Sequence, residues 1–238
     1  MRIVYDNYPF DQRLKPAWGF ACVITGTEKT ILFDTGGDGD ILLSNMRACG
    51  IEPARIDAVV LSHMHADHTG GLNAFLEANS DVTVYLPEVF AEGLKRRVRK
   101  AGATLVETNE PCNVCHTAWT TGVLSSGIPE QGLYLKGREG LVVVTGCAHP
   151  GIVRMVEAAT EHAGEKPSAV LGGFHMKGAS RFEIAAVIEG FRELGVRRAA
   201  PSHCSGDETR RMMKQAFGED YLPSGVGARL PFVTEGDA

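Results

Sequence analysis

Residues 62–71 read SHMHADHTGG, which places three histidines and an aspartate within six positions, followed by two glycines. The preceding segment, DAVVLS, is apolar and predicts a buried strand that ends where the histidines begin. His63 and His65 are two residues apart, so an extended backbone presents both side chains on one side, toward a common ion. Asp67 and His68 follow the predicted bend, which suits a second ion close to the first. The glycines are expected to let the backbone turn tightly toward the next helix.

The residue types in this stretch favour a metal site over an ordinary polar loop. Neutral imidazole and carboxylate groups are the usual ligands of zinc and related divalent metals. A single histidine in a surface loop would mean little, but four ligand-type side chains in six positions after a buried strand are hard to explain as scattered polar residues. We therefore expect two divalent metal ions. Zinc suits the imidazole-rich set best, and manganese or iron is allowed when carboxylates take part.

The chain as a whole has the composition of a globular protein. It contains 238 residues, of which 44% are hydrophobic and 22% are charged, which is enough for a sizeable core. No stretch approaches the roughly 20 apolar residues of a membrane helix, and the first ten residues carry charge where a signal peptide would be apolar. We expect a cytoplasmic protein whose six cysteines stay reduced. The net charge of −5 argues against nucleic-acid binding, which depends on basic side chains.

Two further patterns receive ordinary interpretations. The basic run KRRVRK at 95–100 lies inside a helical pattern, and we interpret it as a solvated helix face. The glycines of DTGGDGD at 34–40 resemble a phosphate-binding loop, but no lysine follows at the required spacing, so we exclude that function.

The order of the remaining segments predicts two similar halves in one domain, 1–238, with a seam near 107–122 where periodicity is lost. In the first half we expect strands at 2–6, 20–26, 30–36, 57–63 and 82–87 and helices at 40–50, 72–78 and 88–102. In the second half we expect strands at 122–128, 131–137, 140–146, 168–174, 196–203 and 228–233 and helices at 151–164, 181–195 and 207–218. The pattern predicts an α+β fold in which two mixed sheets pack face to face with helices outside.

The segment HMHADH matches the HxHxDH signature of the metallo-β-lactamase superfamily, and the chain resembles that family along most of its length. The resemblance implies an αββα sandwich. It also implies that Asp34, in LFDTGG, braces the metal loop. His149, in TGCAHPG, would complete the first metal site with His63 and His65, and His203, in PSHCSG, would join Asp67 and His68 at the second. Like His63, both of these histidines follow an apolar strand, and groups at strand ends on one rim can converge.

The superfamily's fourth motif normally supplies an aspartate that bridges both metals, but the matching segment here, VLGGFHM, contains none. His175 is the nearest substitute. It could ligate one metal, donate a proton, contact substrate, or lie behind the ligands as a supporting residue.

Several motifs of this chain resemble those of one subfamily. They are SHMHADHTGGL, TGCAHPGIV, GGFHM and HCSG, together with YDN near the start and WGF before the second strand. The members of that subfamily are named for 7,8-dihydropterin-6-methyl-4-(β-D-ribofuranosyl)aminobenzene-5'-phosphate synthase, an enzyme that catalyses one step of methanopterin biosynthesis. One segment departs from that pattern, because residues 121–137 are shorter here than the resemblance implies. Since such loops shape substrate pockets, the pterin substrate does not follow from the resemblance alone.

Two pairs of cysteines remain to be interpreted. CNVCH at 112–116 has the spacing of a redox or zinc pair, but it follows a proline in an aperiodic stretch, and we favour ordinary loop residues beside the active site over thiol- or metal-linked regulation. Cys147 and Cys204 lie two residues and one residue from expected ligands, and we expect them to pack the floor of the site rather than ligate, where oxidation could impair the enzyme.

These residues predict a metal-dependent hydrolase. A divalent ion lowers the pKa of bound water from 15.7 to about 7, so a metal-held hydroxide is the expected nucleophile for a small ester, lactone or phosphodiester. We assign Asp67 to orienting it and accepting its proton, and His175 to the leaving group. A di-iron redox enzyme is disfavoured because the second ligand is His65 rather than glutamate.

Two alternatives to the hydrolase stay open. One is the synthase-type transferase, which joins a dihydropterin methyl group to a ribofuranosylaminobenzene phosphate. The other is a pterin- or nucleotide-binding protein with little catalysis. The expected partner is a small molecule, phosphorylated or pterin-like, and neither nucleic acid nor a membrane; the oligomeric state stays open.

Overall fold

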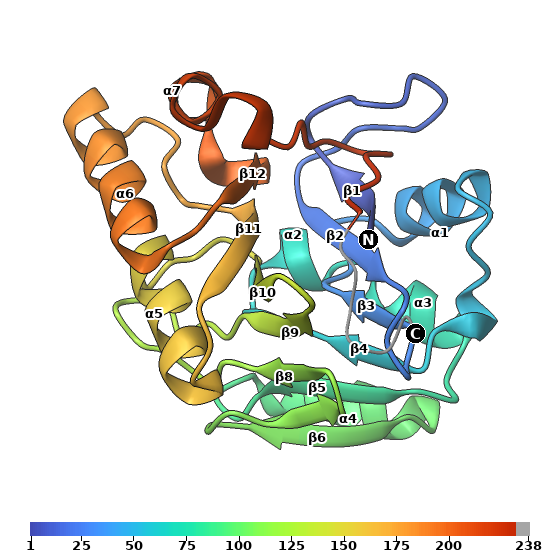
Figure 1. The fold of residues 1–238 in the computed structure, drawn as a ribbon. Coiled ribbons are helices and arrows are strands. Elements are labelled where there is room, and N and C mark those ends of the chain that lie inside the picture. Colours follow the sequence, from blue (N-terminus) through green and yellow to red (C-terminus); the bar gives the residue numbers. More distant parts are fainter. Residues whose placement is uncertain (232–238) are drawn as a thin grey trace.

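The computed structural model describes residues 1–231, which form two six-stranded sheets facing each other between layers of helices (Figure 1). The first sheet has the order β1-β2-β3-β4-β5-β6. Its strands are β1 Arg2–Asp6, β2 Phe20–Ile24, β3 Ile31–Phe33, β4 Ala58–Val60, β5 Thr83–Pro87 and β6 Thr104–Thr108. The second sheet has the order β12-β11-β10-β9-β8-β7. Its strands are β7 Asn113–Cys115, β8 Ala118–Thr120, β9 Leu133–Gly137, β10 Gly140–Thr145, β11 Pro167–Gly173 and β12 Arg198–Ser202.

Both sheets are mixed, as the sequence predicted. Strands β3 to β6 run parallel in the first sheet, and β10 to β12 run parallel in the second, while the remaining neighbours are antiparallel. The carboxyl ends of parallel strands meet at one edge of a sheet. Residues that follow β3, β4, β10, β11 and β12 are therefore brought toward a common rim.

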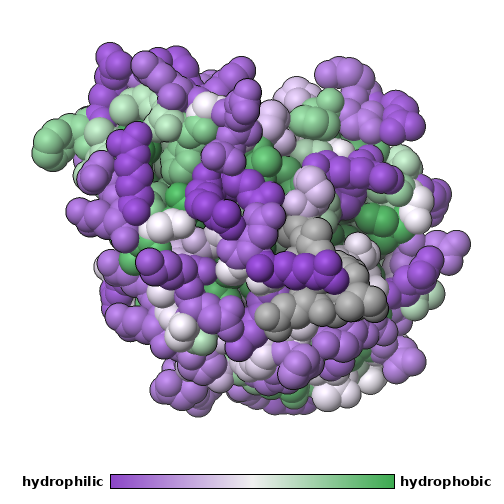
Figure 2. Space-filling view, viewed as in Figure 1, coloured by the Kyte–Doolittle hydropathy of each residue, from purple (hydrophilic) through white to green (hydrophobic). Residues whose placement is uncertain are grey.

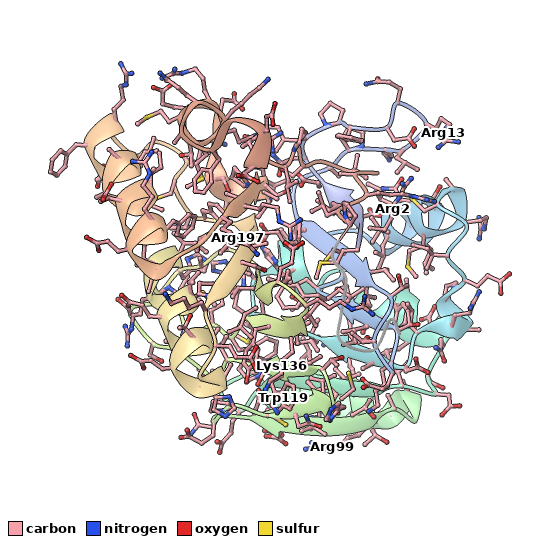
Figure 3. All side chains as sticks on the ribbon, in the orientation of Figure 1. Arg2, Arg13, Arg99, Trp119, Lys136 and Arg197 are labelled. Carbon is pink, nitrogen blue, oxygen red and sulfur yellow. The ribbon has the colours of Figure 1, made fainter. Side chains whose placement is uncertain are left out.

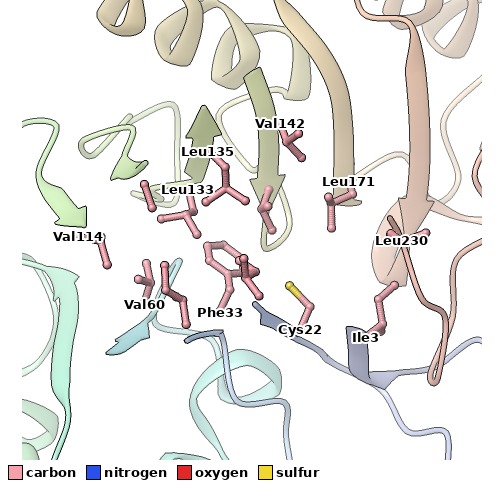
Figure 4. Packing of buried hydrophobic residues seen from close by; sticks show 14 of the residues in the cluster. Ile3, Cys22, Phe33, Val60, Val114, Leu133, Leu135, Val142, Leu171 and Leu230 are labelled. Carbon is pink, nitrogen blue, oxygen red and sulfur yellow. The ribbon is translucent and has the colours of Figure 1, made fainter. Parts of the chain in front are cut away.

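Three apolar clusters hold the layers together. The central cluster lies between the sheets, where Phe33 and Val60 of the first sheet face Leu133, Val142 and Leu171 of the second (Figure 4). A second cluster joins the outer face of the first sheet to its helices, and a third does the same for the second sheet. Every described strand buries most of its side chains except β6, which fits the long apolar runs in the sequence.

The helices begin and end where the sequence supplies caps. In α6, Ser180 and Glu183 form a capping box and Gly195 ends the helix in a left-handed conformation. The α-helices are α1 Gly39–Ala48, α2 Ala66–Thr69, α3 Leu72–Ala78, α4 Glu92–Ala101, α5 Ile152–Ala163, α6 Arg181–Leu194 and α7 Asp207–Phe217, and the 3-10 helices are η1 Pro53–Arg55, η2 His203–Ser205 and η3 Gly218–Asp220.

Three predicted segments differ in the structure. Residues 122–128 form no strand: 126–128 make a bend, 125–127 are exposed, and a single bridge joins Leu124 to Glu130. The aperiodic stretch at 107–122 contains the short strands β7 and β8, whose three residues each are too few to show a period. Residues 228–231 make only an isolated bridge, Arg2 with Arg229, and the last two positions of that predicted strand lie outside the described residues.

The basic residues of the run in α4 are exposed except at one position, Lys95, and the apolar Val98 is buried. Lys95 is buried, and its ammonium donates to Glu107 at 2.6 Å and to the Glu88 carbonyl at 2.7 Å. Arg99 lies at the outer edge of the molecule and also pairs with Glu107 (Figure 3). Lys95 and Arg99 therefore link α4 to Glu107 of β6, and Arg96, Arg97 and Lys100 are exposed to solvent.

The surface is hydrophilic and the cysteines are unpaired, as the charged content and the cysteine pattern of the sequence predicted. The face shown in Figure 2 is largely hydrophilic, with hydrophobic residues in small patches. On the second sheet, the Lys136 ammonium lies 5.5 Å from the centre of the Trp119 ring (Figure 3). All six cysteines are free, as expected. Among residues 1–231, no helix has the length and apolar character needed to cross a membrane.

Candidate metal centre

The structure brings the predicted ligands together at one rim of the sandwich. His63 follows β4 and lies just before α2, which carries Asp67 and His68. His149 follows β10 and His203 follows β12, so these two come from the other half of the chain. Within each sheet the strands concerned run parallel, so their carboxyl ends share one edge, and the distances between ligand atoms show that the two edges meet.

The first group of ligand atoms, here called the first triad, belongs to His63, His65 and His149. One ring nitrogen of each lies within 4.8 Å of the other two. His63 Nε2 is 3.1 Å from His65 Nδ1. The side chains of His63 and His65 therefore share one side, as the two-residue spacing predicted.

The second group, here called the second triad, contains Asp67, His68 and His203, with ligand atoms again within 4.8 Å of one another. His203 Nε2 lies 3.3 Å from Asp67 Oδ2. The rings of His63 and His68 are 4.2 Å apart at their centres, so the two triads are neighbours.

These residues fit divalent metal ions on two independent grounds. The Nε2 atoms of His149 and His203 are buried without a hydrogen bond, which is rare for a buried polar atom unless a ligand completes it. Burial and the nearby His68 ring lower the pKa of His63, and burial and the His175 ring lower the pKa of His149 to about 4. Both rings are neutral at pH 7, which is the form that binds a metal.

Asp34 braces the metal loop, as the resemblance implied. Its carboxylate accepts hydrogen bonds from the Ser62 N–H and hydroxyl, each at 2.7 Å, and lies 2.7 Å from His68 Nδ1. Burial lowers the pKa of His68, but the Asp34 carboxylate, together with Asp67 and Glu130, raises it overall. Since Nδ1–H donates to Asp34, the opposite nitrogen, Nε2, is the one available to an ion.

The glycines that close the histidine stretch have a different role from the predicted turn. Gly70 has ordinary helical angles, φ −64° and ψ −32°. A Cβ on Gly70 would lie 2.3 Å from the Gly37 carbonyl oxygen, and one on Gly71 would lie 2.2 Å from that of Thr35. Close approach to the segment after β3, rather than a turn, therefore requires both glycines.

Glu130 is a buried residue of the site that sequence reasoning missed. Its carboxylate accepts backbone N–H bonds from Cys147 at 2.8 Å and from Ala148 and His149 at 2.9 Å each. Burial raises the pKa of Glu130, and these three bonds offset only part of the rise. Glu130 follows the bend at 126–128, and nothing in the local sequence pattern signals that its carboxylate holds the loop of His149.

Asp6 and Asn7 also support the site through Ser202 and His203. From the sequence, YDN was noted only as a motif of the subfamily, and these two residues were assigned no role. His203 Nδ1 lies 2.9 Å from Asn7 Oδ1, which can only accept, so His203 keeps Nε2 free for a ligand. The Asp6 carboxylate accepts from the Ser202 hydroxyl and from the Tyr8 N–H. Asp6 at the end of β1 and Asn7 just after it thus orient His203.

Backbone strain is concentrated at this rim. Four non-glycine residues among 1–231 have φ in the left-handed region: Asp34 (56°), Ala148 (59°), His175 (52°) and His203 (46°). Such conformations cost of order 1–3 kcal/mol each and persist where the surrounding structure over-determines them. All four lie at or beside the two triads.

His175 lies at the mouth of the site. Its side chain is exposed, its ring centre is 4.3 Å from that of His149, and its ligand atom lies within 4.8 Å of the sulfurs of Cys147 and Cys204. The hydrogen bond between the two thiols raises the pKa of Cys147 and lowers that of Cys204, and His175 contributes to the latter. An open hollow of about 500 Å³ adjoins His149 and His175 and is lined further by Arg154, Glu157 and Phe174.

The CNVCH stretch lies elsewhere, so the expectation that it borders the active site is wrong. Cys112 and Cys115 belong to or flank β7, the edge strand, which β8 and β9 separate from β10. Cys115 is buried in the core between the sheets. Burial raises the pKa of both thiols.

Comparisons with known proteins agree with this architecture. The sequence model of the metallo-beta-lactamase superfamily matches residues 19–153. The 7,8-dihydropterin-6-methyl-4-(beta-D-ribofuranosyl)-aminobenzene-5'-phosphate synthase of Methanocaldococcus jannaschii is 31% identical over 252 aligned positions, which cover 87% of this chain and 86% of the relative. That alignment is longer than the 238-residue chain, so the relative contains residues without a counterpart here.

Solved structures show the same sandwich. Tm1679, a metal-dependent hydrolase of the beta-lactamase superfamily, superposes with a TM-score of 0.81 at 26% identity and covers 97% of each chain. YhfI of Bacillus subtilis, a metallo-beta-lactamase fold protein, gives a TM-score of 0.72 at 13% identity, covering 95% of this chain and 97% of its own. The predicted αββα fold is therefore confirmed.

Proposed function

This chain belongs to the metallo-β-lactamase superfamily, and on that premise we propose that it is a divalent-metal-dependent hydrolase of a small ester, lactone or phosphodiester. The observation that carries the proposal is the pair of neighbouring triads at one rim, with two buried ring nitrogens that lack hydrogen bonds. Divalent ions in such a ligand set supply a nucleophilic water at neutral pH and neutralise charge on the substrate oxygen.

The remaining roles fall to side chains that face the triads. Asp67 is half-buried beside His203 and is our candidate for orienting the attacking water and accepting its proton on a carboxylate oxygen. His175, exposed at the mouth, is our candidate for donating a ring proton to the leaving group. The hollow beside it would hold the rest of the substrate, with the Arg154 guanidinium available to an anionic group.

The test combines metal analysis with a substrate screen. Protein stripped with chelator and reloaded with zinc, manganese or iron is assayed on phosphodiesters, lactones and thioesters. We expect turnover of at least one class that chelator abolishes and metal restores. Metal-loaded protein that is silent on every ester would contradict the hydrolase, and tight pterin binding in the same preparation would favour a binding protein.

A second candidate function is supported by the 31% identical relative, whose name is that of a synthase. The reaction would join a dihydropterin methyl group to a ribofuranosylaminobenzene phosphate. The same metal-loaded protein is incubated with the dihydropterin and aminobenzene partners, and formation of the coupled product is followed by mass. Product formation without ester turnover would replace the hydrolase by the transferase.

A further inference from the structure

The sulfur of Cys147 lies between the two triads. It is 3.2 Å from Nε2 of His68, the nitrogen that faces away from Asp34. The ligand atoms of Cys147, His63 and His68 all lie within 4.8 Å of one another. Since His63 belongs to the first triad and His68 to the second, this sulfur borders both groups.

We propose that Cys147 is a further metal ligand, which binds as a thiolate beside His63 and His68. This inference rests on the proposed function, because it needs metal at the triads. Thiolate, imidazole and carboxylate are all established zinc donors, so the sulfur adds a compatible ligand to the set.

The protein holds this sulfur in a fixed position. Cys147 is buried, with 4% of its surface exposed. Its backbone N–H donates to Glu130 at 2.8 Å, the residue after it has a left-handed φ of 59°, and the Cys204 thiol donates to its carbonyl at 3.6 Å. These contacts fix the backbone from which the sulfur projects, and a metal ligand must be held within about 0.5 Å of its working position.

The end of β11 supplies no ligand of its own beside Cys147. A Cβ on Gly173 would lie 2.4 Å from the Gly146 carbonyl oxygen, 2.7 Å from Cys204 Sγ and 3.2 Å from the Cys147 Cα. No side chain fits at that position, so β11 delivers no carboxylate to the triads. The two cysteines occupy the space that such a side chain would fill, and Cys147 is the one whose sulfur reaches His63 and His68.

Metal binding by Cys147 exchanges the thiol proton for the metal ion. The S–H bond of Cys147 breaks, a sulfur–metal bond forms, and the proton leaves to solvent, because a coordinating thiol is deprotonated outright. The added thiolate makes the site softer and favours zinc or cobalt over manganese.

Cobalt substitution tests the assignment in the intact protein. A thiolate bound to Co²⁺ gives a charge-transfer band in the near ultraviolet that imidazole and carboxylate do not give. We expect the band in the unaltered protein and in Cys204→Ser, and its loss in Cys147→Ser. A band that survives in Cys147→Ser, or one that depends on Cys204 alone, would overturn the assignment.

Zinc-edge X-ray absorption of the unaltered protein keeps the inference testable if Cys147→Ser does not fold. We expect a sulfur neighbour at about 2.3 Å from zinc. Bound zinc with only nitrogen and oxygen neighbours would refute the thiolate and leave the proposed function intact. Failure to bind any divalent ion would instead refute the proposed function.

Discussion

Two stretches of this chain are rich in metal-ligand residues, yet only one belongs to a convergent site. SHMHADHTGG emerges from β4 at the rim, where strand ends of both sheets deliver His149 and His203. CNVCH lies on the edge strand β7, where Cys115 packs between the sheets and His116 faces solvent. None of its three ligand-type residues joins any group of potential metal ligands among residues 1–231.

The difference teaches that position in the topology outweighs local density of ligand residues. A tetrahedral ion needs about four donors around one point, and a short stretch rarely supplies them alone. At the rim, parallel strands supply donors from segments far apart in the chain, and buried carboxylates orient them. Around the β7 thiols, the described part of the chain forms no group of three ligand side chains, and Cys115 lies in the core with Cys112 packed against it.

The largest effect that would sharpen this comparison is expected for His63→Ala. Loss of a buried ring from the first triad should lower metal content and reduce turnover by more than about 100-fold, since even supporting residues are worth 10–100-fold in metal affinity. Bound metal per chain and kcat/KM are measured. His116→Ala, on the exposed histidine of CNVCH, is the matched control and should change neither. Equal metal content in the two variants would break the comparison.

Asp34→Asn comes next, with metal affinity reduced by about 10–100-fold. The amide can still accept from the Ser62 N–H, but its NH2 group faces His68 Nδ1 and cannot accept that proton. The His68 proton then shifts to Nε2, which removes the lone pair offered to metal. Affinity is measured by chelator competition, with Asp38→Asn at the N-cap of α1 as the control. An unchanged affinity would show that the brace does not set the tautomer.

Glu130→Gln should act mainly on stability. One of its oxygens becomes an NH2 group that confronts a backbone N–H of the 147–149 loop, which leaves a buried donor unsatisfied and costs about 1–3 kcal/mol. Urea unfolding measures the loss. Glu161→Gln, on the exposed face of α5, is the control. If both variants unfold at the same urea concentration, Glu130 does not hold the loop.

The smallest effects belong to the other stretch. Cys112→Ser and Cys115→Ser should leave metal content unchanged, and each should lower the free energy of unfolding by no more than about 1 kcal/mol. Metal analysis and urea unfolding provide both readings. Loss of bound metal in either variant would mean that β7 carries a metal site after all, and the contrast drawn here would fail.

Much of the architecture was predictable because hydrophobic period and turn residues are local signals. The expected segments from 2–6 through 88–102 all have counterparts in the structure, with boundaries shifted by a few residues. The prediction at 122–128 was wrong because this segment mixes three apolar residues with glycines and serines, which are turn signals. The bend there is followed by Glu130, whose buried carboxylate accepts a hydrogen bond from the His149 N–H.

By itself the sequence determined the ligand types, their placement after apolar strands, and through these the family and the sandwich. Only the tertiary structure decided which residues meet: the role of Glu130 and Asn7, the central place of Cys147, and the exclusion of CNVCH. The physical reason is the distance along the chain over which each feature is encoded. Periodicity, capping and strand ends are encoded within a few neighbouring residues, whereas a ligand set and its hydrogen-bonded supports form between segments up to 196 residues apart, and their geometry exists only after the sheets have packed.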